Sequence, residues 1–421
     1  MLRAFVNAFK IPDLRRKILF TLVIIAVYRL GSFIPVPNID IQELERQLQV
    51  SQGFLSFINL FSGGALANFA VFALGIMPYI TSSIIMQLLT VVIPKLEQWQ
   101  KQGEAGTKKI TQWTRYMTVT LALLQSTGLI FLFNNQYAGV VKVFTPSRVT
   151  FMVITLTAGT AMIMWFGELI TQRGIGNGMS VLIFTSIISE LPSQGYSILQ
   201  RGTAQFGIIV AIGLLIIIAV VFMEQGQRRI PVQYAKRVVG RRMTQGGSTY
   251  IPLKVNQAGV IPIIFASSVL YFPTLLGSVI QWAPFRSFLD NHLVNQASPV
   301  YITIYGLLVV FFAYFYTAIS FNPTDTADNI RKYGGFIPGI RPGKPTADHL
   351  DHILSRITLP GSLFLATIAL IPSIAFIIMG VDPNIFPFGG TSVLIVVGVA
   401  LETMKQLESQ LTMRHYEGFL R

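Results

Sequence analysis

The chain has 421 residues, of which 52% are hydrophobic and 12% are charged, and its formal net charge is +14. An ordinary soluble domain carries about 25% charged residues, so this composition excludes a soluble enzyme and a disordered scaffold. The sequence contains no cysteine, which excludes disulfides, thiolate metal sites and a cysteine nucleophile.

Ten apolar stretches are predicted to be membrane spans, because a bilayer helix needs roughly 20 mostly apolar residues. In chain order they cover residues 18–36, 69–93, 114–133, 149–167, 178–192, 205–223, 257–280, 300–320, 358–380 and 390–411. The last stretch becomes polar after Leu401, where we expect the helix to continue into water. The sequence therefore predicts an all-α integral membrane protein with ten transmembrane helices.

The first stretch shares one feature with signal peptides, because Arg15, Arg16 and Lys17 precede it. It ends in residues 32–37, with the sequence SFIPVP, which contains no small-residue cleavage site. We therefore expect an uncleaved first helix.

The basic residues are distributed unequally between the loops on the two sides. With a cytoplasmic N-terminus and ten spans, 26 of the 32 lysines and arginines fall in cytoplasmic segments and five fall in outer loops. This is the positive-inside bias of membrane proteins, and an odd number of spans would misplace the later basic loops. Arg29 falls inside the first span near its outer end, where we expect it to snorkel to the interface.

Two cytoplasmic loops, residues 224–254 and 321–357, are more basic than the topology requires. The first carries seven basic residues against the single acid Glu224, and the second carries five basic residues and four aspartates. Loops of about 30 residues without an apolar stretch are often functional. Their charge favours docking of an acidic or phosphate-rich partner, and the alternative is a plain solvated face.

No catalytic constellation is found in the sequence. His349 and His352 lie three residues apart in a loop, where a solvated helix is a simpler interpretation than a metal site. Ion-coupled carriers bury carboxylates within their spans, whereas the acids here lie in loops or near span ends, with Glu168 and Glu402 closest to the membrane. We therefore expect no enzyme, metal or cofactor, and a proton- or sodium-driven carrier is disfavoured, although backbone carbonyls can hold sodium.

Residues 53–93 form one apolar stretch of about forty residues, too long for a single span. Ser62-Gly63-Gly64 interrupts it, and the piece from Phe57 to Asn68 is too short to cross a bilayer. This piece is predicted to be re-entrant or cavity-lining, because irregular backbone at membrane depth is tolerated only there. The alternative is a helix lying in the outer interface.

An internal repeat relates the second and seventh spans. Residues 75–80 (GIMPYI) are followed by two serines, and so are residues 259–264 (GVIPII). Each span is second in a set of five, and because five is odd, halves 1–195 and 196–421 would enter the membrane in opposite directions. The alternatives are a chance match or a shared glycine–proline kink.

Isoleucines at the centre of both repeats have two interpretations. Ile76, Ile80 and Ile264 are ordinary core residues or, if the halves enclose a path, an apolar constriction that excludes ions by dewetting.

Longer motifs span nearly the whole chain in order. They are FSGGALANFAVFALGIMPYITSSIIMQLLTVV (61–92), GEAGTKKITQWTRY (103–116), QRGIGNGMS (172–180), EQGQRRIPVQYAKR (224–237), LKVNQAGVIPIIFASS (253–268), FNPTDTADNIRKYGGFIPGIRPG (321–343) and FGGTSVLIVVG (388–398). By these motifs the chain resembles the SecY family, the channel-forming subunits of bacterial Sec protein translocases.

The resemblance implies two five-helix halves around an hourglass pore that a short re-entrant helix plugs. The implied pore ring is Ile76, Ile80, Met179, Ile183, Ile264 and Ile395. The implied plug, residues 57–68, includes Phe57, Asn59, Ser62, Gly63, Gly64, Ala65 and Asn68. The implied lateral gate to lipid has the polar members Thr81, Gln125 and Asn256. Met179 departs from the usual branched residue, although a flexible thioether can also close a ring.

The resemblance also implies partners and a function. Docking of the ribosome, through rRNA phosphates, and of the SecA motor would use Arg228, Arg229, Lys236, Arg237, Arg241, Arg242 and Arg341. SecE and SecG would be accessory subunits in the cytoplasmic membrane, with both termini cytoplasmic and anionic lipid around the basic loops. A signal sequence would open the channel, and secretory polypeptides would cross it or leave sideways into lipid. The rival interpretations are an inverted-repeat transporter of a small solute and a membrane-embedded enzyme.

Overall fold

The computed structural model describes residues 9, 11–48, 59, 61–136, 139–234, 237–239, 242–244, 247–279, 283–295, 297–378 and 390–419. Each of the ten predicted spans overlaps a helix, although residues 69–76 of the second span are turns and a β-bridge. The first set of five is α2 (Pro12–Gly31), α5 (Met77–Val92), α7 (Glu104–Gln136), α8 (Pro146–Arg173) and α9 (Gly178–Arg201). The second set is α10 (Thr203–Gln225), α11 (Ile261–Val279), α13 (Pro299–Ser320), α15 (Lys344–Ile378) and α16 (Gly390–Phe419). Short elements between them are α3 (Ile41–Leu48), α6 (Pro94–Lys101), α12 (Ala283–Leu289), the π-helical turn η1 (Asp290–Val294) and α14 (Pro323–Lys332).

The starts of these helices follow from local sequence. Proline occupies the first turn of α2, α5, α6, α8, α13 and α14, where its missing N–H costs nothing. Side chains of Asn177, Ser298 and Asn322 cap α9, α13 and α14 by accepting hydrogen bonds from the first backbone N–H groups. The helix boundaries are therefore set by residues outside the apolar stretches as well as by hydropathy.

Within the described residues, five helices are long and apolar enough to cross a membrane alone, namely α7, α8, α10, α13 continued by α14, and α15. A sixth candidate is the pair α5–α6, which bends by 100° at a short break. The most apolar 18-residue stretch of α10 has a mean hydropathy of 3.2, yet only 11% of that stretch is buried within the protein. A helix this apolar on every side needs lipid or a partner around it. The remaining helices are shorter or more polar in their described parts, so the count of ten spans stays a prediction.

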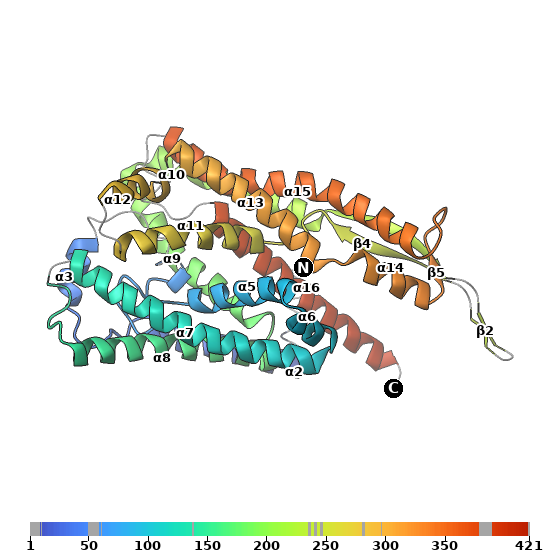
Figure 1. Ribbon diagram of the computed structural model, residues 1–421, viewed down its shortest axis with the longest axis horizontal. Helices are drawn as coiled ribbons and strands as arrows, with labels where there is room; N and C mark the ends of the chain where they lie inside the picture. The colour runs from blue at the N-terminus through green and yellow to red at the C-terminus, as the bar shows by residue number, and fades with distance from the viewer. Residues whose placement is uncertain are drawn as a thin grey trace.

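The two sets of helices pack in the same order. In the first set α5 contacts α7, α7 contacts α8, α8 contacts α9, and α2 contacts α8. The second set repeats these four pairings as α11 with α13, α13 with α15, α15 with α16, and α10 with α15. In Figure 1, α7 and α8 run along one side of the molecule and α13 and α15 along the other, with α5, α11 and α16 between them. This repeated packing agrees with two five-helix halves, and the division at residues 195 and 196 stays a prediction.

Contacts between the two sets are confined to a few helices. Helix α9 contacts α10 and α16, and α7 contacts α11. A small apolar cluster of Leu14 and Ile18 in α2 with Leu407 and Leu411 in α16 adds a further link. The halves therefore meet along a continuous junction, with α9 on one side and the α7–α11 contact on the other.

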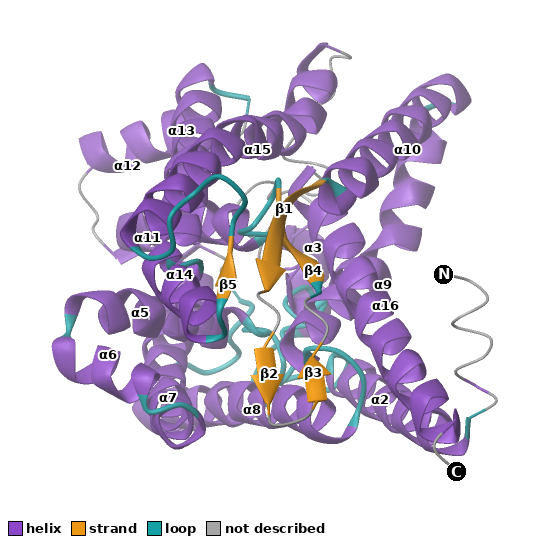
Figure 2. Cartoon of the chain, turned by 90° about the vertical axis from the view of Figure 1, so that its right-hand side faces the viewer, coloured by secondary structure: helices purple, strands orange, loops and turns teal. Residues whose placement is uncertain are grey.

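The two basic loops form a small folded unit that sequence reasoning missed. Strands β1 (Gln227–Tyr234) and β4 (Ser248–Lys254) pair antiparallel, and β5 (Gly335–Phe336) from the second loop joins the free edge of β1. Strands β2 (Arg237–Val239) and β3 (Arg242–Thr244) form a second ribbon. Seen end-on in Figure 2, these strands lie toward the viewer, and Figure 1 shows β2 projecting beyond the right-hand end of the helices. Both segments were predicted only as loops, whereas backbone pairing joins them.

Alternation along β1 provides the core of this unit. Ile230 and Val232 are buried while their neighbours are exposed, as a strand with one buried face requires. They pack with Leu253 of β4 and with residues of α14 and α15, including Leu350 and Leu354. The first turns of α15, before its apolar stretch, therefore belong to this unit.

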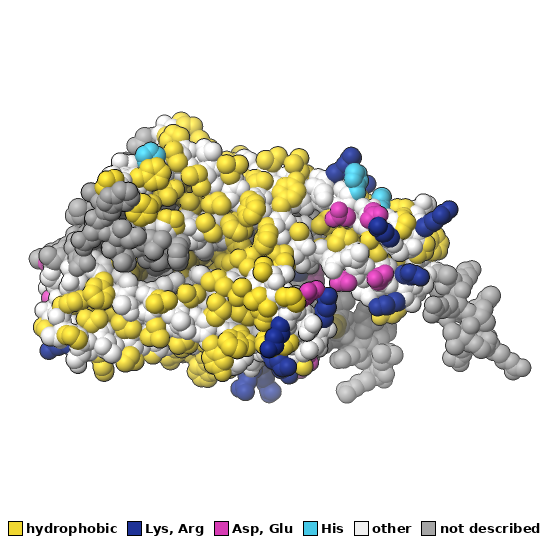
Figure 3. Space-filling model, in the orientation of Figure 1, with side chains coloured by type: hydrophobic (Ala, Val, Ile, Leu, Met, Phe, Trp, Pro, Cys, Tyr) yellow, Lys and Arg dark blue, Asp and Glu magenta, His cyan; other side chains and the backbone are white. Residues whose placement is uncertain are grey.

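Surface composition divides the molecule along its long axis. Figure 3 shows hydrophobic side chains over most of the visible body and most of the basic side chains near the right-hand end. Figure 1 places α6, α14 and the strands at that same end. An apolar body beside a charged cap is the distribution that a bilayer and an aqueous compartment would select.

The apolar core of the strand unit gives a first prediction. Leu253→Ala is expected to destabilise this unit by about 2–4 kcal/mol, because Leu253 is 1% exposed and its removal leaves a cavity. Limited proteolysis of the protein in detergent would then cut the segment 224–254 faster than in the parent protein. Thr249→Ala in the same strand is the control, because Thr249 is exposed. Equal proteolysis of the two variants would contradict a packed unit.

Candidate functional site

The six residues of the implied pore ring come together in one apolar cluster. Five of them, Ile76, Ile80, Met179, Ile183 and Ile395, are buried members of the cluster, and Ile264 packs against it half-buried. They come from four helices, α5 and α9 of the first set and α11 and α16 of the second. The cluster therefore lies at the junction between the two halves.

Helix geometry explains how so few helices supply six side chains. Ile76 and Ile80 are four residues apart at the start of α5, and Met179 and Ile183 are four residues apart at the start of α9, so each pair lies on one helix face. Met179 packs tightly over Gly167 of α8, where any side chain at residue 167 would collide with its sulfur atom. The unbranched thioether fits a space left by a missing Cβ.

Both repeated stretches have the same local backbone. Gly75 has φ of +56° and Gly259 has φ of +61°, and each lies two residues before the start of its helix. An L-residue with a side chain adopts such φ values only at a cost. The two glycines therefore let the chain turn sharply into α5 and α11, and they place Ile76 and Val260 at the first turn of each helix.

The segment predicted to be a plug covers this cluster. Phe61 and Ala65 are buried members of the same cluster as the ring residues. The segment is helical at Asn59, Phe61 and Ser62 and continues as turns to Phe69. Phe57 lies outside the described residues.

Local hydrogen bonds shape these turns. The Asn59 side-chain oxygen accepts from the Ala67 N–H at 2.9 Å, and the Ser62 hydroxyl accepts from the Leu66 N–H at 3.1 Å. Gly63 and Gly64 have φ of +64° and +86°. These backbone angles reverse the chain between the residues that the two hydrogen bonds join. Asn68 is half-buried at the end of the turn.

Two residues of α2, Tyr28 and Arg29, contact the plug segment. These contacts were not predicted from the sequence. The Tyr28 hydroxyl donates to the Ser62 carbonyl oxygen at 3.3 Å. The Arg29 guanidinium donates to the Gly63 carbonyl oxygen, a contact that the expectation of snorkelling to the interface did not include. The signal available in the sequence was a Tyr–Arg pair inside an apolar stretch, and its partners are backbone atoms that no sequence pattern identifies.

The three implied gate residues are dispersed. Thr81 of α5 donates to its own helix at the Met77 carbonyl oxygen, and Gln125 lies half-buried on α7. Asn256 is buried before α11, where its amide donates to the Glu224 carboxylate at 2.6 Å and to the Gly259 carbonyl. Among the described residues no hydrogen bond joins any two of the three. Helices α7 and α11 are in contact. The Asn256 side chain, through its bond to Gly259, positions the chain where it enters α11.

The implied docking residues occupy the strand unit and the loop beside it. Arg228 and Arg229 lie exposed on β1, and the Arg229 guanidinium stacks on the Tyr250 ring at 4.8 Å. Arg341 is exposed, and its carbonyl oxygen accepts from the Thr346 hydroxyl at 2.8 Å. Arg237 and Arg242 lie on β2 and β3. Lys236 and Arg241 lie outside the described residues.

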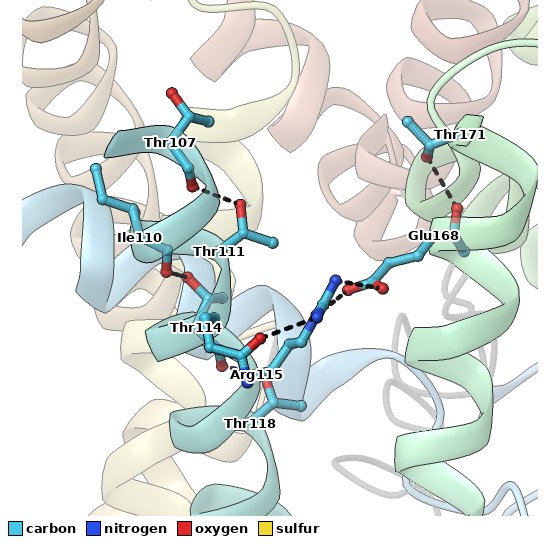
Figure 4. Close-up of polar contacts among 10 residues, drawn as sticks. Thr107, Ile110, Thr111, Thr114, Arg115, Thr118, Glu168 and Thr171 are labelled. Atoms are coloured by element: carbon cyan, nitrogen blue, oxygen red, sulfur yellow. Dashed lines mark hydrogen bonds and ion pairs between the residues drawn. The ribbon is translucent and has the colours of Figure 1, made fainter. Parts of the chain in front are cut away.

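One of the two carboxylates predicted to lie closest to the membrane, Glu168, is paired. Glu168 of α8 accepts two hydrogen bonds from Arg115 of α7, at 2.6 and 2.8 Å, in the bidentate geometry shown in Figure 4. Gln112 accepts a third hydrogen bond from the same guanidinium at 3.0 Å. Such a pair is directional and strong for its exposure. Glu168 therefore joins two helices and lacks the surroundings of a proton or sodium relay. No group of His, Cys, Asp and Glu suited to a metal is found in the described part of the chain.

These features define a class of protein, an all-α polytopic protein whose two repeated halves meet at an apolar cluster covered by a re-entrant segment. The SecY family model matches residues 70–404. The chain is 56% identical to the protein translocase subunit SecY of Streptomyces scabiei and 52% identical to that of Mycobacterium bovis, over the full length of each protein. The chain belongs to the SecY family, and it is a multi-pass membrane protein.

Solved structures give the same fold at low sequence identity. A structure described as a protein conducting channel matches with a TM-score of 0.65 at 18% identity, covering 96% of both chains. A SecY structure described by its plug domain, which stabilises the closed state of that translocation channel, matches with a TM-score of 0.62 at 17% identity, again over 96% of both chains. Sec61 from a canine ribosome–channel complex matches at 0.61 and 17% over the same share of each chain.

Proposed function

We propose that the chain is a protein-conducting channel that passes unfolded secretory polypeptides across the membrane and releases apolar segments sideways into lipid. The observation that carries this proposal is the single apolar cluster that both halves build at their junction. The full-length relatives are named translocase subunits, which supports the same function.

An apolar ring suits a polypeptide path. Isoleucine and methionine side chains offer no hydrogen bonds to a passing chain and resist ions by dewetting when the ring is narrow. Opening such a ring breaks only apolar contacts, so no buried polar group loses its partner within it. The arrangement described here, with five ring residues buried and the plug segment packed on them, is a closed one.

The route into lipid is proposed at the α7–α11 contact. Ile84 of α5 packs against both the junction cluster and the core of the second half, so separation of the halves would begin beside it. A signal sequence is an apolar helix and would replace these contacts with its own. The roles of Thr81 and Gln125 at this seam remain proposals, and Asn256 acts there by positioning α11.

The strand unit is proposed as the docking face for the ribosome and for the SecA motor, with SecE and SecG as accessory subunits. Exposed Arg228, Arg229 and Arg341 give it the positive charge that rRNA phosphates or an acidic protein surface would bind. The same charge, on a cytoplasmic face in the inner membrane, would also attract anionic lipid.

The solute-transporter alternative has less support. Glu168, one of the two acids predicted nearest the membrane, is held by Arg115, and ion-coupled transport uses buried carboxylates that change partners. The relatives are named as translocase subunits and not as enzymes.

The ring gives a second prediction. Ile183→Asn is expected to raise the ion conductance of the closed channel several-fold in planar bilayers, because a polar side chain hydrates an apolar constriction. The matched control is Ile188→Asn on the same helix, where the side chain is exposed. Equal conductance in the two variants, at equal yield of folded protein, would remove residue 183 from the ring.

The docking face gives a third prediction. Arg341→Glu is expected to lower SecA-driven transport into proteoliposomes at least fivefold, because the reversed charge repels an acidic partner. Insertion into the membrane should be unchanged. Arg173→Glu, an exposed basic residue at the end of α8, is the control and should transport normally. Normal transport by Arg341→Glu would place motor docking elsewhere.

A further inference from the structure

Two neighbouring side chains of α2 bind the backbone of the plug segment. Tyr28 is 1% exposed, and its hydroxyl lies 3.3 Å from the Ser62 carbonyl oxygen. The Arg29 guanidinium donates to the carbonyl oxygen of the next residue, Gly63. Both acceptors are backbone atoms of the segment, so these bonds exist only while the segment is seated.

Helix α9 supports the same two side chains from the other side. The Ser186 hydroxyl lies 2.6 Å from the Tyr28 hydroxyl and 3.0 Å from the Leu182 carbonyl oxygen, and it donates to Tyr28 when the single Tyr28 hydroxyl hydrogen goes to Ser62. The Ser189 hydroxyl accepts from Arg29 at 2.8 Å. Ser186 and Ser189 are three residues apart, so they share one face of α9. Tyr28 and Arg29 therefore bind α9 as well as the plug segment.

The plug segment approaches this site as closely as backbone allows. A Cβ at Gly63 would lie 3.0 Å from the Ser186 Cα and 3.1 Å from the Arg29 guanidinium. A Cβ at Gly64 would lie 2.6 Å from the Glu190 carboxylate. Both glycines have positive φ, so the Gly–Gly pair is needed for the turn and also for the contact.

These contacts differ in kind from those of the ring. Apolar contacts in the cluster can slide, whereas a hydrogen bond from a guanidinium to a carbonyl is directional and stronger than one between neutral groups. When the segment leaves, the carbonyls of Ser62 and Gly63 lose these donors. The polar contacts therefore favour the seated position specifically.

We propose that Tyr28 and Arg29, positioned by Ser186 and Ser189, form a polar latch that holds Ser62–Gly64 in place and sets how often the closed channel opens. The latch rests on the proposed function, because it acts on the plug of that channel. A weaker latch raises the open population, so a signal sequence would need less binding energy to open the channel.

The test measures how often the plug segment leaves. Ala65 is 0% exposed, and the sequence contains no other cysteine, so an Ala65→Cys protein reports opening through alkylation by a membrane-impermeant maleimide. In proteoliposomes containing the full chain, Arg29→Gln is expected to raise the alkylation rate about tenfold and Tyr28→Phe several-fold. Lys142→Gln is the matched control, because Lys142 is an exposed basic residue of a predicted outer loop whose nearest acid, Asp40, is also exposed.

Tyr28→Phe also guards against loss of folding, because it keeps the ring that stacks on Phe72 at 5.7 Å and removes only the hydroxyl. If Ser186 acts through Tyr28, the double variant Tyr28→Phe with Ser186→Ala should raise the alkylation rate by less than the product of the two separate increases. Parent-like alkylation in Tyr28→Phe and in any folded Arg29→Gln protein would overturn the latch.

Transport by the parent protein separates the two proposals. A parent protein that moves a secretory precursor into proteoliposomes, with alkylation unchanged in the variants, refutes the latch alone. A parent protein that moves no precursor with its motor and accessory subunits present refutes the proposed function, and the latch with it.

Discussion

Apolar contact between side chains of opposite halves is the constraint on which the rest of the structure depends. The junction cluster takes side chains from α5 and α9 on one side and from α11 and α16 on the other. Because these contacts include no hydrogen bonds, the halves can separate without leaving buried polar groups unpaired. Polar contacts lie within a half, as between Arg115 and Glu168, at the plug segment, and between the halves where Lys17 of α2 donates to Gln410 of α16 at 3.5 Å.

The entries to the helices place this cluster. Left-handed glycines before α5 and α11 turn the chain into both helices in the same way, and the Asn177 cap starts α9 next to Met179. Ile76, Ile80, Met179 and Ile264 therefore lie in or next to the first turns of their helices, whereas Ile183 and Ile395 lie in second turns.

The sequence predicted the positions of all ten helices because hydropathy marks lipid-facing and core-facing residues alike. Helices α7 and α15 are longer than predicted, because they start at Glu104 and Lys344 in polar segments that contact α6 and α14. Helix α5 is shorter than predicted, because it starts at Met77. The strand unit was missed because only Ile230 and Val232 alternate within a run of arginines. Ile76, Ile80 and Ile264 stood out in the repeats, whereas Met179, Ile183 and Ile395 needed the family resemblance. The role of Arg29 depends on carbonyl groups of a distant segment, and residue types do not encode those.

The most direct test of the central claim places a photocrosslinker at Ile80 and supplies a ribosome-tethered, half-translocated secretory chain. The account predicts a crosslink to that chain, which disappears when its signal sequence is destroyed. A crosslink only to other helices of the same protein would show that the cluster is ordinary core and that the polypeptide path lies elsewhere.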